Sequence, residues 1–283
     1  MLEQKAKEAM KVLVSGFNDP SILYKNHPFR QPLFNCAYHH FAGKRQKREL
    51  AFVVVVGSLN YGCETRNSDL DFKAAYFPTM GDMYNGKFPV MNVVTDNLDC
   101  SVTTIHHMKK YFLKGNMNFV EVLHSKVFHI NCDLFPFWEV MQRLVVMNVR
   151  ELVLSSFFTA EGMYKKFSLN PLEEGKKASH AYRILIFVRT LVQTGQMEFE
   201  PSVEDRRVIK RYKQGDTSGF EKVYDALHEE VVSLIFKKFD SGKNFVMSDV
   251  VTHLDKTDTT EWLVTNNVAD EMLSKLMFEK LGK

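Results

Sequence analysis

Two aspartates separated by one residue, Asp69 and Asp71, form the pattern with the clearest chemical meaning in this chain. On a β-strand, residues i and i+2 point to the same face, so the two carboxylates would lie side by side. Carboxylates held that close repel one another, and a bound divalent cation is the usual compensation. Oxygen ligands of this kind suit Mg²⁺. The alternative is an exposed turn with two solvated acids, because short Asp-x-Asp pairs recur by chance.

The segment before this pair favours the metal-binding interpretation. Residues 50–57 are apolar and rich in valine, which predicts a strand buried on both faces. Gly57 and Ser58 close this strand, with ten residues between Ser58 and Asp69. A Gly-Ser turn leaves backbone N–H groups free for phosphate oxygens. Together, the strand, the turn and the acidic pair predict a site for a nucleoside triphosphate and its metal ions.

A two-metal site needs a further carboxylate. Asp99 is the best candidate, because it opens residues 98–104, LDCSVTT, which predict another strand. On that strand Asp99 and Ser101 would share one face and leave an apolar face for the core. Asp96, in the loop before the strand, is the alternative.

The elements that must position these residues fall into two unlike halves. Strands and short helices mix in the first half, whereas the pattern beyond about residue 135 is helical. Glycines and a proline predict a loop over residues 79–90. We therefore expect an α+β fold with one domain over residues 1–134 and a helical domain over residues 135–283. Strands are predicted at residues 32–42, 50–57, 69–77 and 98–104, and helices at residues 2–16, 106–113 and 118–124.

The composition limits the class of protein. The chain has 283 residues, 45% hydrophobic and 25% charged, which is typical of soluble globular proteins and excludes disorder, collagen and coiled coil as the main architecture. We expect no membrane span and no signal peptide, because apolar runs are short and the N-terminus is charged. Four widely spaced cysteines predict reduced thiols in a cytoplasmic protein. A net charge of +3 does not by itself indicate nucleic acid.

Residues 57–73, GSLNYGCETRNSDLDFK, resemble the signature of the DNA polymerase β-like nucleotidyltransferases. The form G-S-x-x-x-G-x-x-x-x-x-S-D-x-D is similar to the predicted nucleotidyltransferase branch that is associated with RNA repair and is common in phages and bacteria. Residues 109–125 resemble that branch's K-G-N-P-N-x-x-E-x-L segment, with Met117 in place of proline. Residues 176–195 resemble its later helix with Lys and His-x-x-Arg. The basic residue that often follows the second aspartate is displaced to Lys73.

The resemblance implies a small mixed β-sheet core with flanking helices, followed by a helical C-terminal domain that closes the nucleotide cleft. It implies transfer of a nucleoside monophosphate from a nucleoside triphosphate to an acceptor hydroxyl, with release of pyrophosphate and with two Mg²⁺ ions that Mn²⁺ can replace. Asp69 and Asp71 would hold both ions, and Asp99 would bind one and help to deprotonate the acceptor. Gly57 and Ser58 would hold the β- and γ-phosphates. Alignment and charge neutralisation would supply most of the rate.

Five further residues are candidates for binding the nucleotide. Arg66 and Lys73 flank the acidic pair, where they would touch the triphosphate or balance the carboxylates when metal is absent. Lys176, His180 and Arg183 follow helical spacing and form one stripe. Facing the cleft, this stripe would bind phosphates, and the alternative is a solvated basic flank.

A second basic cluster is a candidate for binding the acceptor. Arg206, Arg207, Lys210, Arg211 and Lys213 cover about half of a predicted helix, and the first four are the candidates for contacting the phosphates of RNA or DNA. A solvated surface helix is the alternative, and the more common origin of such a pattern.

Two classes of function remain open from the sequence. The first is an active nucleotidyltransferase whose acceptor is an RNA end, which the branch and the basic helical half favour, or a protein hydroxyl or small molecule. The second is a non-catalytic nucleotide-binding or interaction protein on the same fold, such as a sensor or a partner of a toxin or defence system. Three intact aspartates argue against the second class, because binding alone does not need all of them.

Overall fold

A mixed β-sheet forms the centre of the first half of the chain. The computed structural model describes residues 2–18, 48–66, 68–95, 98–167, 169, 173–239 and 259–281. Within these ranges five strands pair in the order β3-β4-β2-β1-β5. Strand β2 is antiparallel to β1 and parallel to β4, while β3 and β5 join the edges in antiparallel pairing. The strands are β1 (Leu50–Val56), β2 (Leu70–Tyr76), β3 (Met91–Thr95), β4 (Leu98–Thr104) and β5 (Phe128–Ile130).

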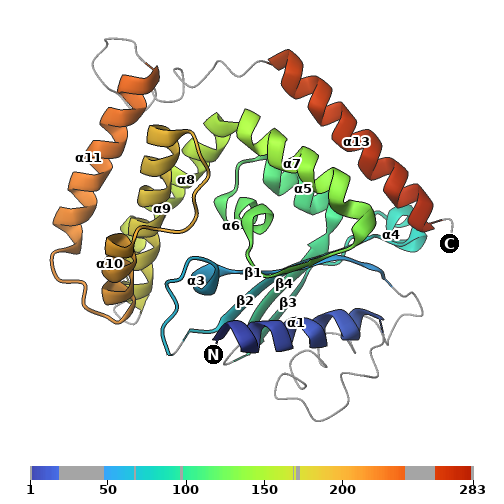
Figure 1. Cartoon of the computed structure of the whole chain (residues 1–283), viewed down its shortest axis with the longest axis horizontal. Helices are drawn as coiled ribbons and strands as arrows, with labels where there is room; N and C mark the ends of the chain where they lie inside the picture. The colour runs from blue at the N-terminus through green and yellow to red at the C-terminus, as the bar shows by residue number, and fades with distance from the viewer. Residues whose placement is uncertain are drawn as a thin grey trace.

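Helices cover both faces of this sheet (Figure 1). Helix α1 (Leu2–Asn18) packs four buried apolar side chains on one face. Helices α5 (Ile105–Leu113) and α7 (Phe135–Met147) cover the other face, where the rings of Phe52 and Trp138 meet edge-on with centroids 5.1 Å apart. Every residue of β1 is therefore buried, which explains its unbroken apolar sequence.

The second half of the chain is helical. Helix α9 (Glu174–Thr194) lies at its centre and packs against α8 (Val149–Phe167), α10 (Val203–Lys213) and α11 (Phe220–Phe239). It ends at Gly195, whose φ of 74° gives the left-handed cap common after helices. This packing turns one side of α9 and the end of α10 toward the sheet, where the candidate site lies.

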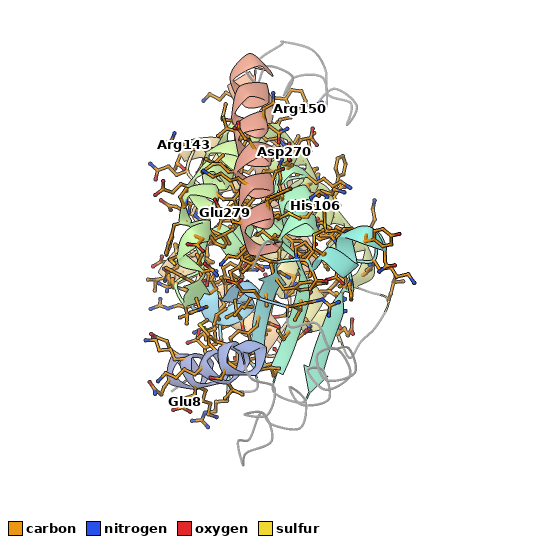
Figure 2. All side chains as sticks on the ribbon, turned by 90° about the vertical axis from the view of Figure 1, so that its right-hand side faces the viewer. Glu8, His106, Arg143, Arg150, Asp270 and Glu279 are labelled. Atoms are coloured by element: carbon orange, nitrogen blue, oxygen red, sulfur yellow. The ribbon has the colours of Figure 1, made fainter. Side chains whose placement is uncertain are left out.

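The last helix, α13 (Thr259–Leu281), returns to the first half and packs along α7 (Figure 1). Asp270 of α13, which is labelled in Figure 2, accepts a hydrogen bond from Lys109 of α5. Lys280 Nζ lies 3.0 Å from Asp133 Oδ2. These pairs cross the boundary expected between residues 134 and 135, and the two-domain division itself stays a prediction. None of the described helices has the length and apolar character needed to cross a bilayer.

The predicted α+β architecture, with a small mixed sheet, flanking helices and a helical second half, is confirmed. The loop predicted over residues 79–90 is wrong in its first part, because helix α4 (Met80–Tyr84) forms there. Thr79 and Asp82 form a reciprocal capping box that stabilises this short helix. Strands β3 and β5 were not predicted, because such short segments depend on their neighbours for pairing. The strand expected at residues 32–42 lies outside the described residues.

Candidate active site

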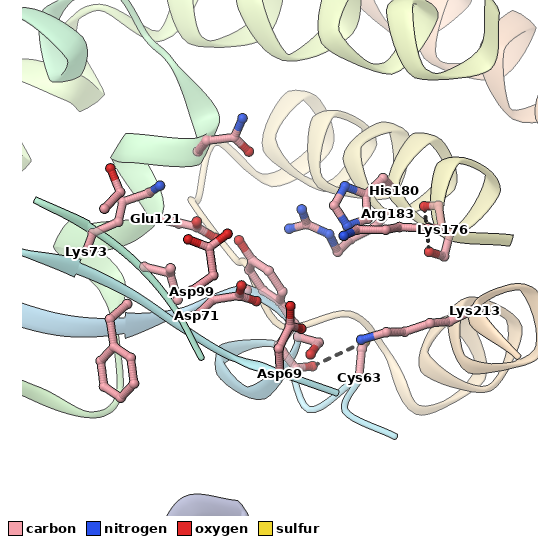
Figure 3. Close-up of a pocket in the computed structure, with 18 of the residues that line it drawn as sticks. Cys63, Asp69, Asp71, Lys73, Asp99, Glu121, Lys176, His180, Arg183 and Lys213 are labelled. Atoms are coloured by element: carbon pink, nitrogen blue, oxygen red, sulfur yellow. Dashed lines mark hydrogen bonds between the residues drawn. The ribbon is translucent and has the colours of Figure 1, made fainter. Parts of the chain in front are cut away.

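A cavity of about 710 Å³ lies between the sheet and the helical half. Its walls come from strands β2 and β4, from the turn α3 (Gly57–Asn60) that follows β1, and from helices α9 and α10. Figure 3 shows the acidic side chains on the sheet side, together with Lys73 of β2, and Lys176, His180, Arg183 and Lys213 on the helical side. The polar residues that define these two sides are Ser58, Asp69, Asp71, Lys73, Asp99, Glu121, Lys176, His180, Arg183 and Lys213.

The three predicted aspartates meet in this cavity. Asp71 and Asp99 are direct neighbours in the parallel pairing of β2 with β4, and Asp69 precedes β2. Burial, followed by the negative charges of Asp69 and Asp99, raises the pKa of Asp71 to about 6. The alternative ligand Asp96 lies outside the described residues. The site therefore concentrates negative charge where the strand pattern predicted it.

These carboxylates fit Mg²⁺ as a group of oxygen donors. Magnesium is usually held by one or two protein carboxylates together with water and substrate phosphates. Within the described part of the chain, no three His, Cys, Asp or Glu side chains are close enough to hold one ion together. The adjacent pair Asp71 and Asp99 meets the smaller requirement. Burial is the main cause of the raised pKa of Asp71, and the charges of Asp69 and Asp99 add repulsion that a cation would relieve.

The turn after β1 lies directly against this acidic group. Gly57 has a φ of 70°, and a Cβ there would come within 2.0 Å of Asp71 Oδ2, so only glycine fits. The Gly57 N–H, expected to face phosphate, donates instead to the carboxyl of Glu121. The Ser58 hydroxyl is buried and has no hydrogen-bond partner among the described residues. A buried hydroxyl without a partner is rare in folded proteins, and a ligand oxygen is one explanation for it.

The stripe predicted on α9 faces the aspartates across the cavity, as Figure 3 shows for Lys176, His180 and Arg183. The Arg183 guanidinium lies 4.0 Å from the ring centroid of Tyr61, and its Nη1 is buried with no partner in the described structure. Burial, with help from nearby cations, lowers the pKa of His180 to about 3. His180 is therefore neutral at neutral pH and offers hydrogen bonds, while Lys176 and Arg183 offer charge.

Lys213, which the sequence places only in the basic cluster of the helix, also belongs to the candidate active site. Its Nζ donates to Ser68 Oγ at 2.9 Å, and its charge acts on Asp69 and Asp71. It lines the cavity together with Ile209, four residues earlier on α10. That spacing was a usable signal, because it places both residues on the same face of the helix.

Glu121 was also missed, although it belongs to the K-G-N-P-N-x-x-E-x-L-like segment. It lies at the start of the 3-10 helix Glu121–His124 and is buried beside Arg183. Lys73 lines the cavity as expected, with Nζ 4.6 Å from the ring centroid of Phe119 and a pKa lowered by burial. Arg66 is exposed and lies outside the cavity lining.

The four residues proposed for the acceptor also belong to the described chain but do not line this cavity. Arg206 Nη1 lies 2.8 Å from Glu200 Oε1, whereas Arg207 and Arg211 are exposed. Helix α10 thus has two faces, one with Ile209 and Lys213 at the candidate active site and one whose basic side chains lie outside it.

Glu121 should make stability depend on pH. Burial raises its pKa to about 8 from an ordinary 4.5, so the folded state keeps a proton that the unfolded chain releases. The free energy of unfolding therefore decreases as pH rises between these values. Glu121→Gln removes this titration and should gain stability over the wild type between pH 5 and pH 9, by on the order of 1–3 kcal/mol. Urea unfolding across that range measures the difference.

The exposed Glu139 on α7 provides the matched control. Glu139→Gln should differ from the wild type by a small amount that does not change with pH. A flat difference for Glu121→Gln as well would contradict the buried, protonated state of Glu121.

Comparison with known proteins agrees with this geometry. Residues 38–233, well over half of the chain, match the model of a family described as the RNA repair pathway DNA polymerase beta family. No curated protein is similar enough to match. A crystal structure of a nucleotidyltransferase-like protein from Exiguobacterium sibiricum 255-15 aligns over 84% of this chain and 89% of that chain, at 14% identity and a TM-score of 0.29, which is too low to add weight. On the family match, this chain belongs to the RNA repair pathway DNA polymerase beta family.

Proposed function

We propose that the protein transfers a nucleoside monophosphate from a nucleoside triphosphate to an acceptor hydroxyl and releases pyrophosphate. Its family and fold indicate nucleotidyl transfer. The observation that carries the proposal is the shared cavity, in which Asp69, Asp71 and Asp99 face Arg183 and Lys213. Carboxylates suit magnesium and the cations suit phosphates, so this one cavity offers both parts of a magnesium–nucleotide site.

Asp69, Asp71 and Asp99 would hold two Mg²⁺ ions, which neutralise phosphate charge and favour the ionised acceptor hydroxyl. Asp99 takes the proton from that hydroxyl, whose oxygen forms a bond to the α-phosphorus. The bond from the α-phosphorus to the bridging oxygen of the β-phosphate breaks, and pyrophosphate leaves.

The helical half and the turn serve the triphosphate. The unpartnered Ser58 hydroxyl donates a hydrogen bond to a phosphate oxygen, and Arg183 is aimed into the same cavity. Lys176 and Lys213 add positive charge on the helical side. These groups oppose the negative charge that builds up on the leaving pyrophosphate.

The acceptor that we propose is an RNA end. The family description, with its RNA repair pathway, supports this choice. The exposed cations of α10 outside the cavity add a surface suited to a polynucleotide backbone.

The test is transfer of label from each α-³²P nucleoside triphosphate in the presence of Mg²⁺. Acceptors are RNA with a 3′-hydroxyl, the same RNA with a 3′-phosphate, and a mixture of proteins. We expect labelled RNA only with the free hydroxyl, and loss of labelling in EDTA. Labelled protein would instead assign a protein hydroxyl as acceptor. If the protein binds nucleotides but transfers label to none of these acceptors, the result would favour the non-catalytic nucleotide-binding function.

The basic surface of α10 yields a separate prediction. Arg207→Glu together with Arg211→Glu should weaken RNA binding by about tenfold and reduce the slope of log affinity against log salt by about 1 to 2. Binding of the nucleoside triphosphate should not change, because both side chains lie outside the cavity. Fluorescence anisotropy of labelled RNA at several salt concentrations measures both quantities.

The control reverses the exposed Lys222 and Lys237 on α11, which gives the same change in net charge elsewhere. If the two double variants bind RNA with equal affinity, the basic side chains of α10 form an ordinary solvated surface and not an RNA-binding surface.

A further inference from the structure

A second cavity, about 460 Å³ in volume, is built on the same turn as the first. Ser58 of α3 lines the first cavity, whereas Asn60, two residues later, lines the second. The remaining walls come from His124, Lys126, residues 197–201 and Arg206. The volume lies within the range of about 300–1,000 Å³ that is typical of small-molecule sites. None of the side chains that line the first cavity also lines the second.

Two side chains that line this cavity each carry a buried polar atom without a partner among the described residues. Asn60 exposes 5% of its surface, and its Oδ1 accepts the backbone N–H of Lys126 at 3.1 Å. That bond fixes the orientation of the amide, which leaves the buried Nδ2 as a free donor. Nε2 of His124 is buried without a partner as well. Unpaired buried polar groups are rare in folded proteins, and a ligand is one of the explanations for them.

The shape and charge of the walls indicate what would bind. The ring of His124 packs against Phe199 with centroids 5.2 Å apart, which holds the imidazole in place as a planar surface. Burial lowers the pKa of His124, so this surface is uncharged at neutral pH. At the rim, the carboxylate of Glu200 pairs with both Lys126 and Arg206. The cavity therefore suits a neutral planar group, in contrast to the cationic side of the first cavity.

We propose that this second cavity binds a nucleobase, with the base ring against His124 and a carbonyl or ring nitrogen of the base accepting a hydrogen bond from Asn60 Nδ2. Stacking on a flat side chain combined with side-chain hydrogen bonds to the base edge is how proteins recognise unpaired bases. The base comes from a single-stranded position of an RNA or from a free nucleoside, since both present the same chemistry. Occupation of the site does not require that the first cavity transfer nucleotides.

The experiment uses two fluorescent probes with the full-length protein. One is 2-aminopurine riboside, and the other is a single-stranded RNA pentamer with 2-aminopurine at its centre. Titrations are run with the first cavity saturated by a non-hydrolysable nucleoside triphosphate and Mg²⁺. We expect probe binding to persist under this saturation. If both probes bind, a free nucleoside is sufficient for recognition by the second cavity. If only the pentamer binds, the recognised base belongs to an RNA strand.

Three variants locate the probe. His124→Ala removes the flat surface and should weaken binding by about tenfold. Asn60→Asp keeps the acceptor for the Lys126 N–H but replaces the free donor, and should weaken binding to a similar extent. His129→Ala changes an exposed histidine on β5 and should have no effect. Binding of the triphosphate analogue, measured in each variant, reports whether the fold and the first cavity are intact.

Photocrosslinking tests the nucleobase proposal in the wild-type protein as well. An RNA pentamer carrying 4-thiouridine should photocrosslink within residues 124–126 or 197–201. Crosslinks only elsewhere, displacement of the probe by the triphosphate analogue, no binding of either probe, or unchanged affinity in both His124→Ala and Asn60→Asp would overturn the proposal. Loss of nucleotidyl transfer with probe binding intact would count against the proposed function alone.

Discussion

Asp71→Asn should abolish nucleotidyl transfer and leave the protein folded. Asp71 sits at the centre of the acidic group, beside Asp99 across the strand pair and against Gly57 of the turn. An amide is a poor magnesium ligand compared with a carboxylate, so we expect kcat to fall on the order of 10³-fold or more. Transfer of label to RNA measures this loss.

The stability of the Asp71→Asn variant should not fall along with its activity. The pKa of Asp71 is raised to about 6, so its ionised form is less favourable in the folded protein than in the unfolded chain. Above that pH the charge lowers the free energy of unfolding, and the amide of the Asp71→Asn variant carries no charge. The variant should therefore unfold at the same temperature as the wild type at pH 7, or at a higher one.

Asp69→Asn should lose transfer in the same way, and Asp225→Asn, an exposed change on α11, should not. Near-normal turnover by either active-site variant would show that the acidic group is not the reaction centre. A large loss of stability in Asp71→Asn would show that its carboxylate supports the fold instead of straining it.

Asp99→Asn should separate chemistry from nucleotide binding. Asp99 neighbours Asp71 on β4, whereas the phosphate-directed groups Ser58 and Arg183 come from the turn and from α9. Loss of the carboxylate should leave the nucleotide bound but its attacking hydroxyl unactivated. We expect kcat to fall about 10²-fold or more, with the KM for the nucleotide little changed. Steady-state kinetics with the nucleotide and the acceptor varied in turn measure both constants.

Asp96→Asn is the companion variant and should be nearly silent. An inactive Asp96→Asn beside an active Asp99→Asn would transfer the third-ligand role to Asp96. An equal loss of nucleotide binding and of turnover in Asp99→Asn would place this residue at the triphosphate instead of at the acceptor.

The acidic group and its turn could be predicted because their signals are local. Alternation along a strand fixes that Asp71 lies on the face opposite Leu70 and Phe72, and Asp99 on the face opposite Leu98 and Cys100. Gly57-Ser58 marks the end of a buried strand. The pairing that makes Asp71 and Asp99 neighbours is not local, since β2 and β4 are separated by α4 and β3. The sequence therefore predicted the face of each residue, and the structure supplied the register.

The cationic side was harder to predict, because a basic helix does not show which of its faces is covered. Lys213 and Arg207 lie on the same helix, yet only Lys213 reaches the first cavity. The packing of α10 against α9 decides between them, and no short pattern contains that contact. Helix α4 is a different case, because Thr79 and Asp82 have the spacing of a capping box, which predicts the start of a helix. Gly81 within that helix favoured a loop instead.

The parallel pairing of β2 with β4 also bears on the order of folding. An antiparallel hairpin closes locally, whereas this parallel pair forms only after the intervening chain has crossed over, which is slower for non-local contacts. We therefore expect the carboxylates of Asp71 and Asp99 to come together late in folding, against their mutual repulsion. During refolding from urea, recovery of transfer activity should lag behind recovery of the helical circular dichroism signal. Mg²⁺ in the refolding buffer should shorten that lag, so the ligand of the finished site would also assist its assembly.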